Sequence, residues 1–236
     1  MEKINVFCLP FAGGNKYSYR GYQQKAPAEL NIIPIELPGR GARIQESLCT
    51  DVHALVTDVF NQLKNQLSSP YVIYGHSMGT LVGYLLVHKM IKQALPLPQH
   101  LFFTGRMGPA VADTKKNRHL LAKEDFKNEL RELGGVPEEV LSNQELFDFF
   151  EPVLRADFQI VDTYAHQVLE KLPIPISVAI GTEEEITLAE AQAWQDETSF
   201  PIEVKVLSGA HFFIYDHEET ILKWMLNHIK TSRVSR

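Results

Sequence analysis

The sequence predicts a fold of the α/β class, with a mostly parallel, doubly wound sheet. Three observations support this prediction: short apolar runs recur, helical patterns lie between them, and one long helical stretch interrupts the alternation. Strands that alternate with helices are typical of parallel sheets covered on both faces. Of the 236 residues, 44% are hydrophobic and 22% are charged, a mixture that can bury a large core.

Six short apolar runs are predicted as strands, because each is closed by glycine or proline or by a turn that contains glycine. Runs so short and so apolar suit strands that are buried on both faces of a sheet. They are Ile4–Leu9, Ile32–Leu37, Tyr71–Tyr74, Leu101–Thr104, Ile176–Ile180 and Ile202–Leu207.

Four helices are predicted between these strands, from apolar residues that recur at helical spacing. They cover Val52–Leu67, Met78–Ile91, Leu188–Thr198 and Glu218–Ile229. The chain shows no internal repeat and no low-complexity linker. We therefore expect residues 1–236 to form a single domain.

One interval is far longer than the others, since 70 residues lie between Gly105 and Ile176. A crossover between parallel strands needs only a dozen residues or more. The interval reads as helices over Lys123–Leu133, Glu138–Leu141 and Asn143–Leu172, the last broken by Pro152. We expect a helical lid over residues 113–172, approximately; the alternative is extra packing on the sheet.

Charge and composition exclude several classes of function. Lysine and arginine number 23 against 29 aspartates and glutamates, which gives a net charge of −6 and a pI near 5.9. An acidic chain lacks the electrostatic footprint of a nucleic-acid binder and adheres poorly to anionic membranes. No apolar run approaches the ~18 residues of a membrane span, and the N-terminus does not resemble a signal peptide.

Cofactor and redox signals are also absent from the sequence. Cys8 and Cys49 are too few for a disulfide framework or a four-thiolate zinc site, so we expect a reducing, cytoplasmic location. No spacing of histidine, cysteine and carboxylates indicates a metal, and no glycine-rich nucleotide motif is present. We therefore expect no cofactor and no metal.

The most informative stretch is Gly75-His76-Ser77-Met78-Gly79, a G-x-S-x-G motif between a predicted buried strand and an apolar helix. In this context the motif forms a sharp turn that exposes the serine hydroxyl at the carboxyl end of the strand. Ser77 is therefore the candidate nucleophile. The alternative is a purely structural turn of glycine and serine.

A serine nucleophile needs a base, and nine histidines compete for that role. His211 follows the last predicted strand and precedes the final helix, which is the place of the base in hydrolases with this serine turn. His217 is the rival, but it lies at the start of that helix. His76 adjoins the serine, and we expect its side chain to point elsewhere.

The acid that orients the base is expected after an intermediate strand. The strand that ends at Gly181 leads into Glu183, Glu184 and Glu185. A glutamate can fix the imidazole tautomer as an aspartate does. The alternative is a solvated acidic loop, with Asp113 as the next candidate for the acid.

Taken together, these residues resemble the type II thioesterases that accompany nonribosomal peptide and polyketide synthases. The resemblance covers almost the whole chain and is carried by the order of several short motifs. These are Leu9-Pro10-Phe11-Ala12-Gly13-Gly14, Leu37-Pro38-Gly39-Arg40-Gly41, Gly75-His76-Ser77-Met78-Gly79, Leu154-Arg155-Ala156-Asp157, Trp194 and Gly209-Ala210-His211-Phe212-Phe213.

The resemblance implies an α/β-hydrolase fold with a helical lid. It also implies hydrolysis of acyl groups from the phosphopantetheine arm of carrier proteins, which removes misprimed or stalled units. The family usually has an aspartate three residues after the glycine that ends the strand before the acid loop, and Glu184 stands there. The implied oxyanion hole uses the backbone N–H of Met78 and a second N–H from Phe11 or Ala12.

Two other functions stay open at this point. One is a free-standing esterase or lipase that acts on small esters, and the other is a catalytically silent binding module with the same fold. We expect a monomer that meets carrier protein domains. Arg40 or Arg43 could lie near a substrate phosphate, or could belong only to a basic turn.

Overall fold

The computed structural model describes residues 3–113 and 117–234, so parts of the expected domain (1–2, 235–236) and of the expected lid (114–116) lie outside it. A six-stranded sheet runs through the molecule in the order β2-β1-β3-β4-β5-β6, and every pairing is parallel. Its strands are β1 (Ile4–Leu9), β2 (Leu30–Pro34), β3 (Tyr71–His76), β4 (Leu101–Thr104), β5 (Ile176–Gly181) and β6 (Glu203–Leu207).

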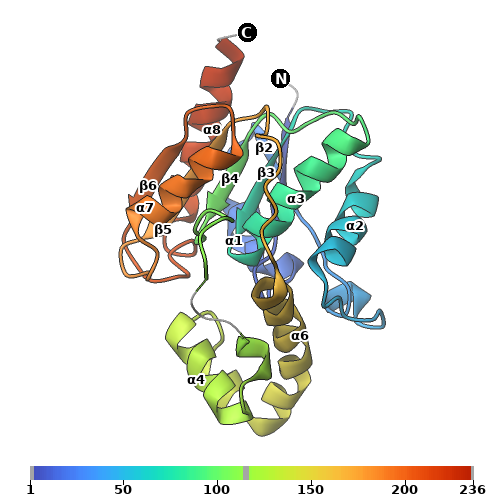
Figure 1. Ribbon diagram of the computed structural model, residues 1–236, viewed down its shortest axis with the longest axis vertical. Coiled ribbons are helices and arrows are strands. Elements are labelled where there is room, and N and C mark those ends of the chain that lie inside the picture. The colour runs from blue at the N-terminus through green and yellow to red at the C-terminus, as the bar shows by residue number, and fades with distance from the viewer. Residues whose placement is uncertain (1–2, 114–116, 235–236) are drawn as a thin grey trace.

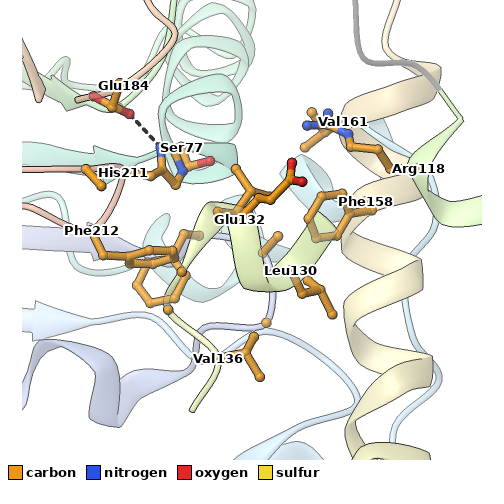
Figure 2. A pocket seen from close by; sticks show the side chains of 18 of the residues that line it. Ser77, Arg118, Leu130, Glu132, Val136, Phe158, Val161, Glu184, His211 and Phe212 are labelled. Atoms are coloured by element: carbon orange, nitrogen blue, oxygen red, sulfur yellow. Dashed lines mark hydrogen bonds and ion pairs between the residues drawn. The ribbon is translucent and has the colours of Figure 1, made fainter. Parts of the chain in front are cut away.

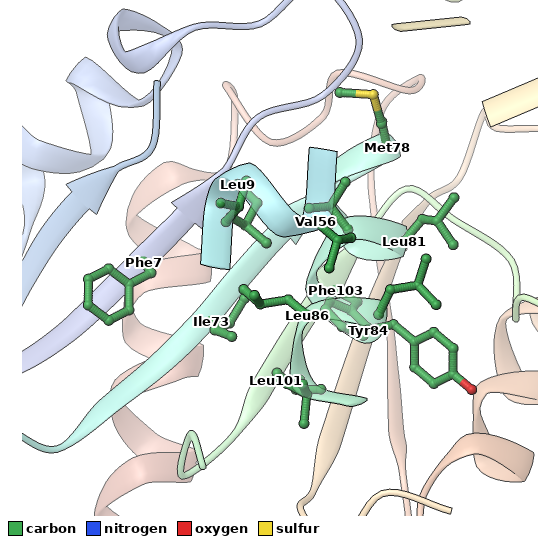
Figure 3. Packing of buried hydrophobic residues seen from close by; sticks show 14 of the residues in the cluster. Phe7, Leu9, Val56, Ile73, Met78, Leu81, Tyr84, Leu86, Leu101 and Phe103 are labelled. Carbon is green, nitrogen blue, oxygen red and sulfur yellow. The ribbon is translucent and has the colours of Figure 1, made fainter. Parts of the chain in front are cut away.

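Helices cover both faces of this sheet (Figure 1). They are α1 (Arg20–Lys25), α2 (Val52–Leu63), α3 (Met78–Lys92), α7 (Leu188–Gln192) and α8 (Glu218–Val234). Alternate residues of β1 face opposite sides: Phe7 and Leu9 pack with α2 and α3, whereas Val6 and Cys8 pack with α1 and α8. Figure 3 shows the first of these layers, where Phe103 and Ile73 of the sheet meet Leu81 and Leu86 of α3.

The predicted strands and helices on the sheet are present, with small differences at their ends. The second strand lies two to three residues earlier than expected, because its pairing with β1 runs from Leu30 to Pro34. The helix predicted to reach Thr198 is α7 followed by a 3₁₀ helix, Ala193–Glu197. The short helix α1 was not predicted, since six mostly polar residues carry no clear apolar period.

The long insertion forms a helical unit beside the carboxyl end of the sheet (Figure 1). It comprises a 3₁₀ helix (Arg118–Leu120), α4 (Lys123–Leu133), α5 (Glu138–Ser142) and α6 (Gln144–Thr163). Apolar residues of these helices bury one another in a core separate from the two sheet layers: Phe126, Leu130, Leu141, Phe147, Leu154 and Phe158.

The predicted helix Asn143–Leu172, broken by Pro152, is wrong in two respects. Helix α6 runs through Pro152, whose ring lies on the exposed face, where water can solvate the carbonyl that the ring leaves unpaired. The helix ends at Thr163 because the chain must then reach β5. The N–H of Leu172 donates to the carbonyl of Glu197 at 2.8 Å, which holds this segment extended.

The chain passes from β1 to β2 on one side and then returns to β3 on the other side of β1, so the strand order reverses between β1 and β3. In doubly wound sheets, the crevice beyond the carboxyl ends of the strands at such a point is the usual ligand site. Here the turn after β1 and Ser77 after β3 lie at that crevice.

Candidate active site

Ser77 connects β3 directly to α3, in a backbone conformation that few non-glycine residues adopt. Its φ is 52° and its ψ is −115°, and strain of this kind costs on the order of 1–3 kcal/mol. The flanking glycines are sterically required. A Cβ on Gly75 would lie 2.5 Å from the backbone of Gly79, and a Cβ on Gly79 would overlap the carbonyl oxygen of Leu9. These close approaches explain the G-x-S-x-G spacing.

His211 and Glu184 meet in two adjacent loops beyond β5 and β6. The Nδ1 atom of His211 lies 2.6 Å from Oε1 of Glu184. The second carboxylate oxygen, Oε2, accepts the N–H of Gly181 at 2.6 Å. The Glu184 side chain is only 2% exposed, so few alternative positions are open to it.

The neighbouring glutamates are placed differently. Glu183 and Glu185 are exposed, although both lie on the wall of the same cavity as Ser77. Among the residues that the structure describes, Glu184 is the glutamate of this loop that contacts His211. Asp113, the reserve candidate for the acid, lies 3.2 Å from Arg118 instead.

Two rival histidines have other partners. The Nε2 atom of His217 lies 3.0 Å from the hydroxyl and 2.9 Å from the carbonyl oxygen of Ser208. His76 is buried beneath His211, with ring centroids 4.8 Å apart. Burial, with a smaller contribution from the charge of His211, lowers the pKa of His76 well below its usual range. His76 is therefore a neutral packing partner of His211.

A chain of buried hydroxyl groups leads to His76. Tyr22 donates to the carbonyl of Ile214 at 2.8 Å, so its oxygen accepts from Tyr74, 3.1 Å away. Thr104 donates to Tyr74 at 3.3 Å. The same hydroxyl also lies 3.3 Å from the carbonyl of Gly75 and 3.0 Å from Nδ1 of His76. The chain ties His76 to the loop that carries the base.

A cavity of about 460 Å³ opens in front of the serine, between the sheet and the insertion. Figure 2 shows Ser77 and His211 on one side of it and Phe158 and Val161 of α6 on the other. Much of its wall is apolar and comes from the insertion, including Leu130, Leu133, Val136, Val140, Val153 and Leu154. The amphipathic pattern of the predicted helices indicates a buried face, but not that this face lines a cavity.

The turn after β1 forms part of the same wall, through Phe11, Ala12 and Gly13. Some of its backbone N–H groups already have acceptors within the protein. The N–H of Gly13 donates to Asp157 at 2.7 Å, and the N–H of Gly14 donates to the carbonyl of Phe11 at 2.9 Å. The remaining candidates to face a ligand are the N–H groups of Phe11 and Ala12. Met78, the first residue of α3, has no acceptor within its own helix.

The prediction that Arg40 or Arg43 lies near a substrate phosphate is contradicted by the structure. Arg40 forms a two-pronged ion pair with Asp157 at 2.6 and 2.8 Å. Arg43 pairs with Asp58 at 2.7 Å and with Glu46. Arg40 also donates to the carbonyls of Pro38 and Gly14, and neither arginine lines the cavity in front of Ser77, so both serve the loop and not a substrate phosphate.

The structure describes two ranges of the chain, residues 3–113 and 117–234. Within them, no group of three or more histidine, cysteine or acidic side chains could hold a metal ion. Also within them, no helix is both long and apolar enough to cross a membrane.

A strained serine after a central strand, a histidine held by a carboxylate and an adjoining cavity define a hydrolase-like site on an α/β fold. The model of the thioesterase domain family matches residues 4–229, nearly the whole chain. A protein of Brevibacillus parabrevis, described as linear gramicidin dehydrogenase LgrE, is 33% identical over 224 residues, which are 93% of this chain and 85% of that protein.

Solved structures agree with this match. ClbQ from the colibactin NRPS/PKS pathway superposes with a TM-score of 0.93 at 28% identity, covering 100% of both chains. The type II thioesterase BorB from the borrelidin biosynthetic cluster superposes with a TM-score of 0.87 at 29% identity, covering 96% of this chain and 92% of BorB.

The chain belongs to the thioesterase domain family, and the class of enzyme is a thioester hydrolase. The predicted α/β-hydrolase fold and the predicted resemblance to type II thioesterases are both confirmed.

Proposed function

We propose that this protein is an editing thioesterase in which Ser77 is the nucleophile, His211 the general base and Glu184 the orienting acid. The single observation that carries the proposal is the 2.6 Å contact between His211 and Glu184 beside a strained serine that opens onto a cavity. Strain at such a residue is usual where the fold holds a functional group in place.

The reaction is a double displacement. His211 takes the proton of the Ser77 hydroxyl as the oxygen attacks the thioester carbonyl, and Glu184 stabilises the resulting imidazolium. The tetrahedral oxyanion collapses, the C–S bond breaks, and His211 returns the proton to the departing thiolate. Water, deprotonated by His211, then attacks the acyl-Ser77 ester. The bond between the acyl carbon and the Ser77 oxygen breaks, His211 returns the proton to that oxygen, and the carboxylic acid leaves.

The developing oxyanion would be stabilised by two backbone donors: the N–H of Met78, at the start of α3, and the N–H of Phe11 or Ala12. Donors fixed before the reaction need no reorganisation as the charge develops. The start of a helix adds a favourable dipole.

The substrate class follows from the cavity. Its apolar wall suits the acyl chain, and a thioester on a phosphopantetheine arm could reach Ser77 past the helical insertion. We therefore assign carrier protein domains of a nonribosomal peptide or polyketide synthase as partners. In this proposal the chain is one domain, acts as a monomer without a cofactor, and uses residues 113–172 as a lid.

Two other functions are separated from this one by experiment, and a third by the sequence. An esterase of small molecules would prefer a nitrophenyl ester over an acyl carrier thioester, and we expect the reverse. A silent binding module would leave Ser77 unlabelled by a fluorophosphonate probe. The activity that the name of the Brevibacillus relative indicates, a dehydrogenase, would need a nucleotide, and the turn after β1 reads Pro10-Phe11-Ala12-Gly13-Gly14 with no G-x-G-x-x-G.

The test is a competition assay in which acyl carrier proteins of varied chain length and a nitrophenyl ester compete for the enzyme. Preferential consumption of one or more acyl carrier proteins supports the proposal. Preference for the free ester, with every carrier thioester left intact, would refute it.

A further inference from the structure

A buried ion pair links two segments that are far apart in the sequence. Arg40, in the loop after β2, and Asp157, in α6, are separated by 117 positions. Nη1 and Nη2 of Arg40 donate to the two carboxylate oxygens at 2.6 and 2.8 Å. The side chains are 7% and 1% exposed, so the pair is shielded from water.

The same pair also holds the turn that follows β1. Asp157 accepts the N–H of Gly13 at 2.7 Å, and Arg40 donates to the carbonyl of Gly14 at 3.1 Å. The ion pair therefore binds two backbone groups of consecutive residues, the N–H of Gly13 and the carbonyl of Gly14. Few small displacements of this turn would keep both contacts.

Helix α6 shapes the turn a second time through Leu154. Gly13 has a φ of 79°, and a Cβ there would lie 2.5 Å from Cδ2 of Leu154. Phe11 and Ala12, immediately before Gly13, line the cavity in front of Ser77. The position of the turn relative to the serine therefore depends on how α6 packs against Gly13.

We infer that Arg40 and Asp157 are positioning residues for the oxyanion hole: they fix the N–H groups of Phe11 and Ala12 in front of Ser77. This inference rests on the proposed function, because the turn matters to the rate only if Ser77 attacks a carbonyl. Loss of one oxyanion donor typically lowers kcat by about 10²–10³.

Conservative variants test this role, since removing one buried charge outright could unfold the protein. Asp157→Asn keeps the shape and an acceptor for Gly13, and Arg40→Lys keeps the charge but loses the two-pronged geometry. Arg43→Lys and Asp58→Asn are the matched controls. Both Nη atoms of Arg43 donate to the carboxylate of Asp58 at 2.7 Å, so this is also a two-pronged arginine–aspartate pair. Arg43 lies three residues after Arg40, and its pair makes no hydrogen bond to the turn.

The readout separates positioning from a merely structural role. For each variant, kcat and KM are measured on one acyl carrier protein, together with the affinity for a trifluoromethyl ketone and for a thioether analogue. The ketone forms a tetrahedral oxyanion with the serine, whereas the thioether resembles only the bound substrate. Thermal unfolding and circular dichroism identify the variants that are folded.

We expect Arg40→Lys and Asp157→Asn to lower kcat and ketone affinity by about 10²-fold or more, with KM and thioether affinity within threefold. The control variants should stay within threefold throughout. If one test variant does not fold, the other decides. Folded variants with near-wild-type kcat and ketone affinity, or with equal losses of ketone and thioether affinity, would overturn the inference.

A Ser77→Ala variant in the same assay keeps the two proposals distinguishable. If Ser77→Ala is inactive while the Arg40 and Asp157 variants are fully active, only the positioning inference fails. If Ser77→Ala hydrolyses the substrate normally, the proposed function itself fails.

Discussion

Nδ1 of His211 lies 2.6 Å from Oε1 of Glu184, although the two residues are 27 positions apart. The register of the sheet explains the meeting. Gly181, at the end of β5, is paired with Leu207, at the end of β6, so the loops that follow them lie side by side. The bond from the N–H of Gly181 to the other carboxylate oxygen aims Glu184 at the imidazole.

Glu184→Gln should lower kcat by about 10⁴, because the amide cannot stabilise the imidazolium and can hold the wrong tautomer. Glu183→Gln and Glu185→Gln, assayed on the same acyl carrier protein, should stay within a few-fold of wild type. These two glutamates are exposed, so their side chains can turn to solvent. A silent Glu184→Gln with a collapse at either neighbour would show that the acid is assigned to the wrong residue.

Gly79→Ala should destabilise the fold as well as the site. The added methyl group would overlap the carbonyl oxygen of Leu9, which is backbone of a central strand and cannot rotate away. Overpacking of this kind typically costs about 1–3 kcal/mol. Urea unfolding of Gly79→Ala and of wild type measures the loss. Equal stability of Gly79→Ala and wild type would contradict the close approach.

Stability should decrease in mild acid because of His100. Burial, with a smaller contribution from His228, lowers the pKa of His100 to about 3. The unfolded side chain titrates near 6.5, so below that pH the unfolded chain holds a proton that the folded chain does not. The free energy of unfolding should therefore fall as pH falls, by about 1.4 kcal/mol per pH unit from this group.

His100→Gln isolates that contribution, because glutamine does not titrate. In the wild type, Nε2 of His100 lies 2.8 Å from the hydroxyl of Ser177, and the glutamine amide can still reach that hydroxyl. Between pH 7 and pH 5, the variant should lose about 2 kcal/mol less than wild type in urea titrations. A wild-type slope in His100→Gln would refute this prediction.

Amide hydrogen exchange should divide the insertion into two parts. Residues 117–151 bury their apolar side chains mainly in the small core of the insertion, so we expect fast exchange there. The part of α6 that follows Leu154 should exchange more slowly, because the ion pair of Asp157 with Arg40 anchors it. Exchange in residues 117–151 as slow as in β3 would count against a mobile lid.

Sequence patterns predicted the sheet and the turn that holds the serine, because both depend on local signals. Buried strands are short apolar runs, and the close approach at Gly75 and Gly79 admits only glycine. The motif order likewise placed Ser77 and His211 at the carboxyl ends of their strands.

Other features depended on contacts that no local pattern encodes. Arg40 and Asp157 stood in separate motifs, and nothing in either indicated that they pair across 117 positions. Pro152 suggested a broken helix, whereas its exposed position in α6 lets the helix continue. The resemblance pointed to Glu184, but the residues themselves did not distinguish three adjacent glutamates, because the contact with His211 depends on the register of β5 against β6.

Trapping the acyl-enzyme shows whether Ser77 attacks a thioester borne by a carrier protein. Wild-type protein is mixed with an acyl-loaded carrier protein and quenched within the first turnover, and both proteins are analysed by mass spectrometry. We predict an acyl group on the peptide that contains Ser77 and a carrier with a free thiol. Ser77→Ala should form no adduct, fold as wild type does and lose about 10⁴–10⁶ in kcat. Hydrolysis by Ser77→Ala at the wild-type rate, or an adduct on another residue, would rule out Ser77 as the nucleophile.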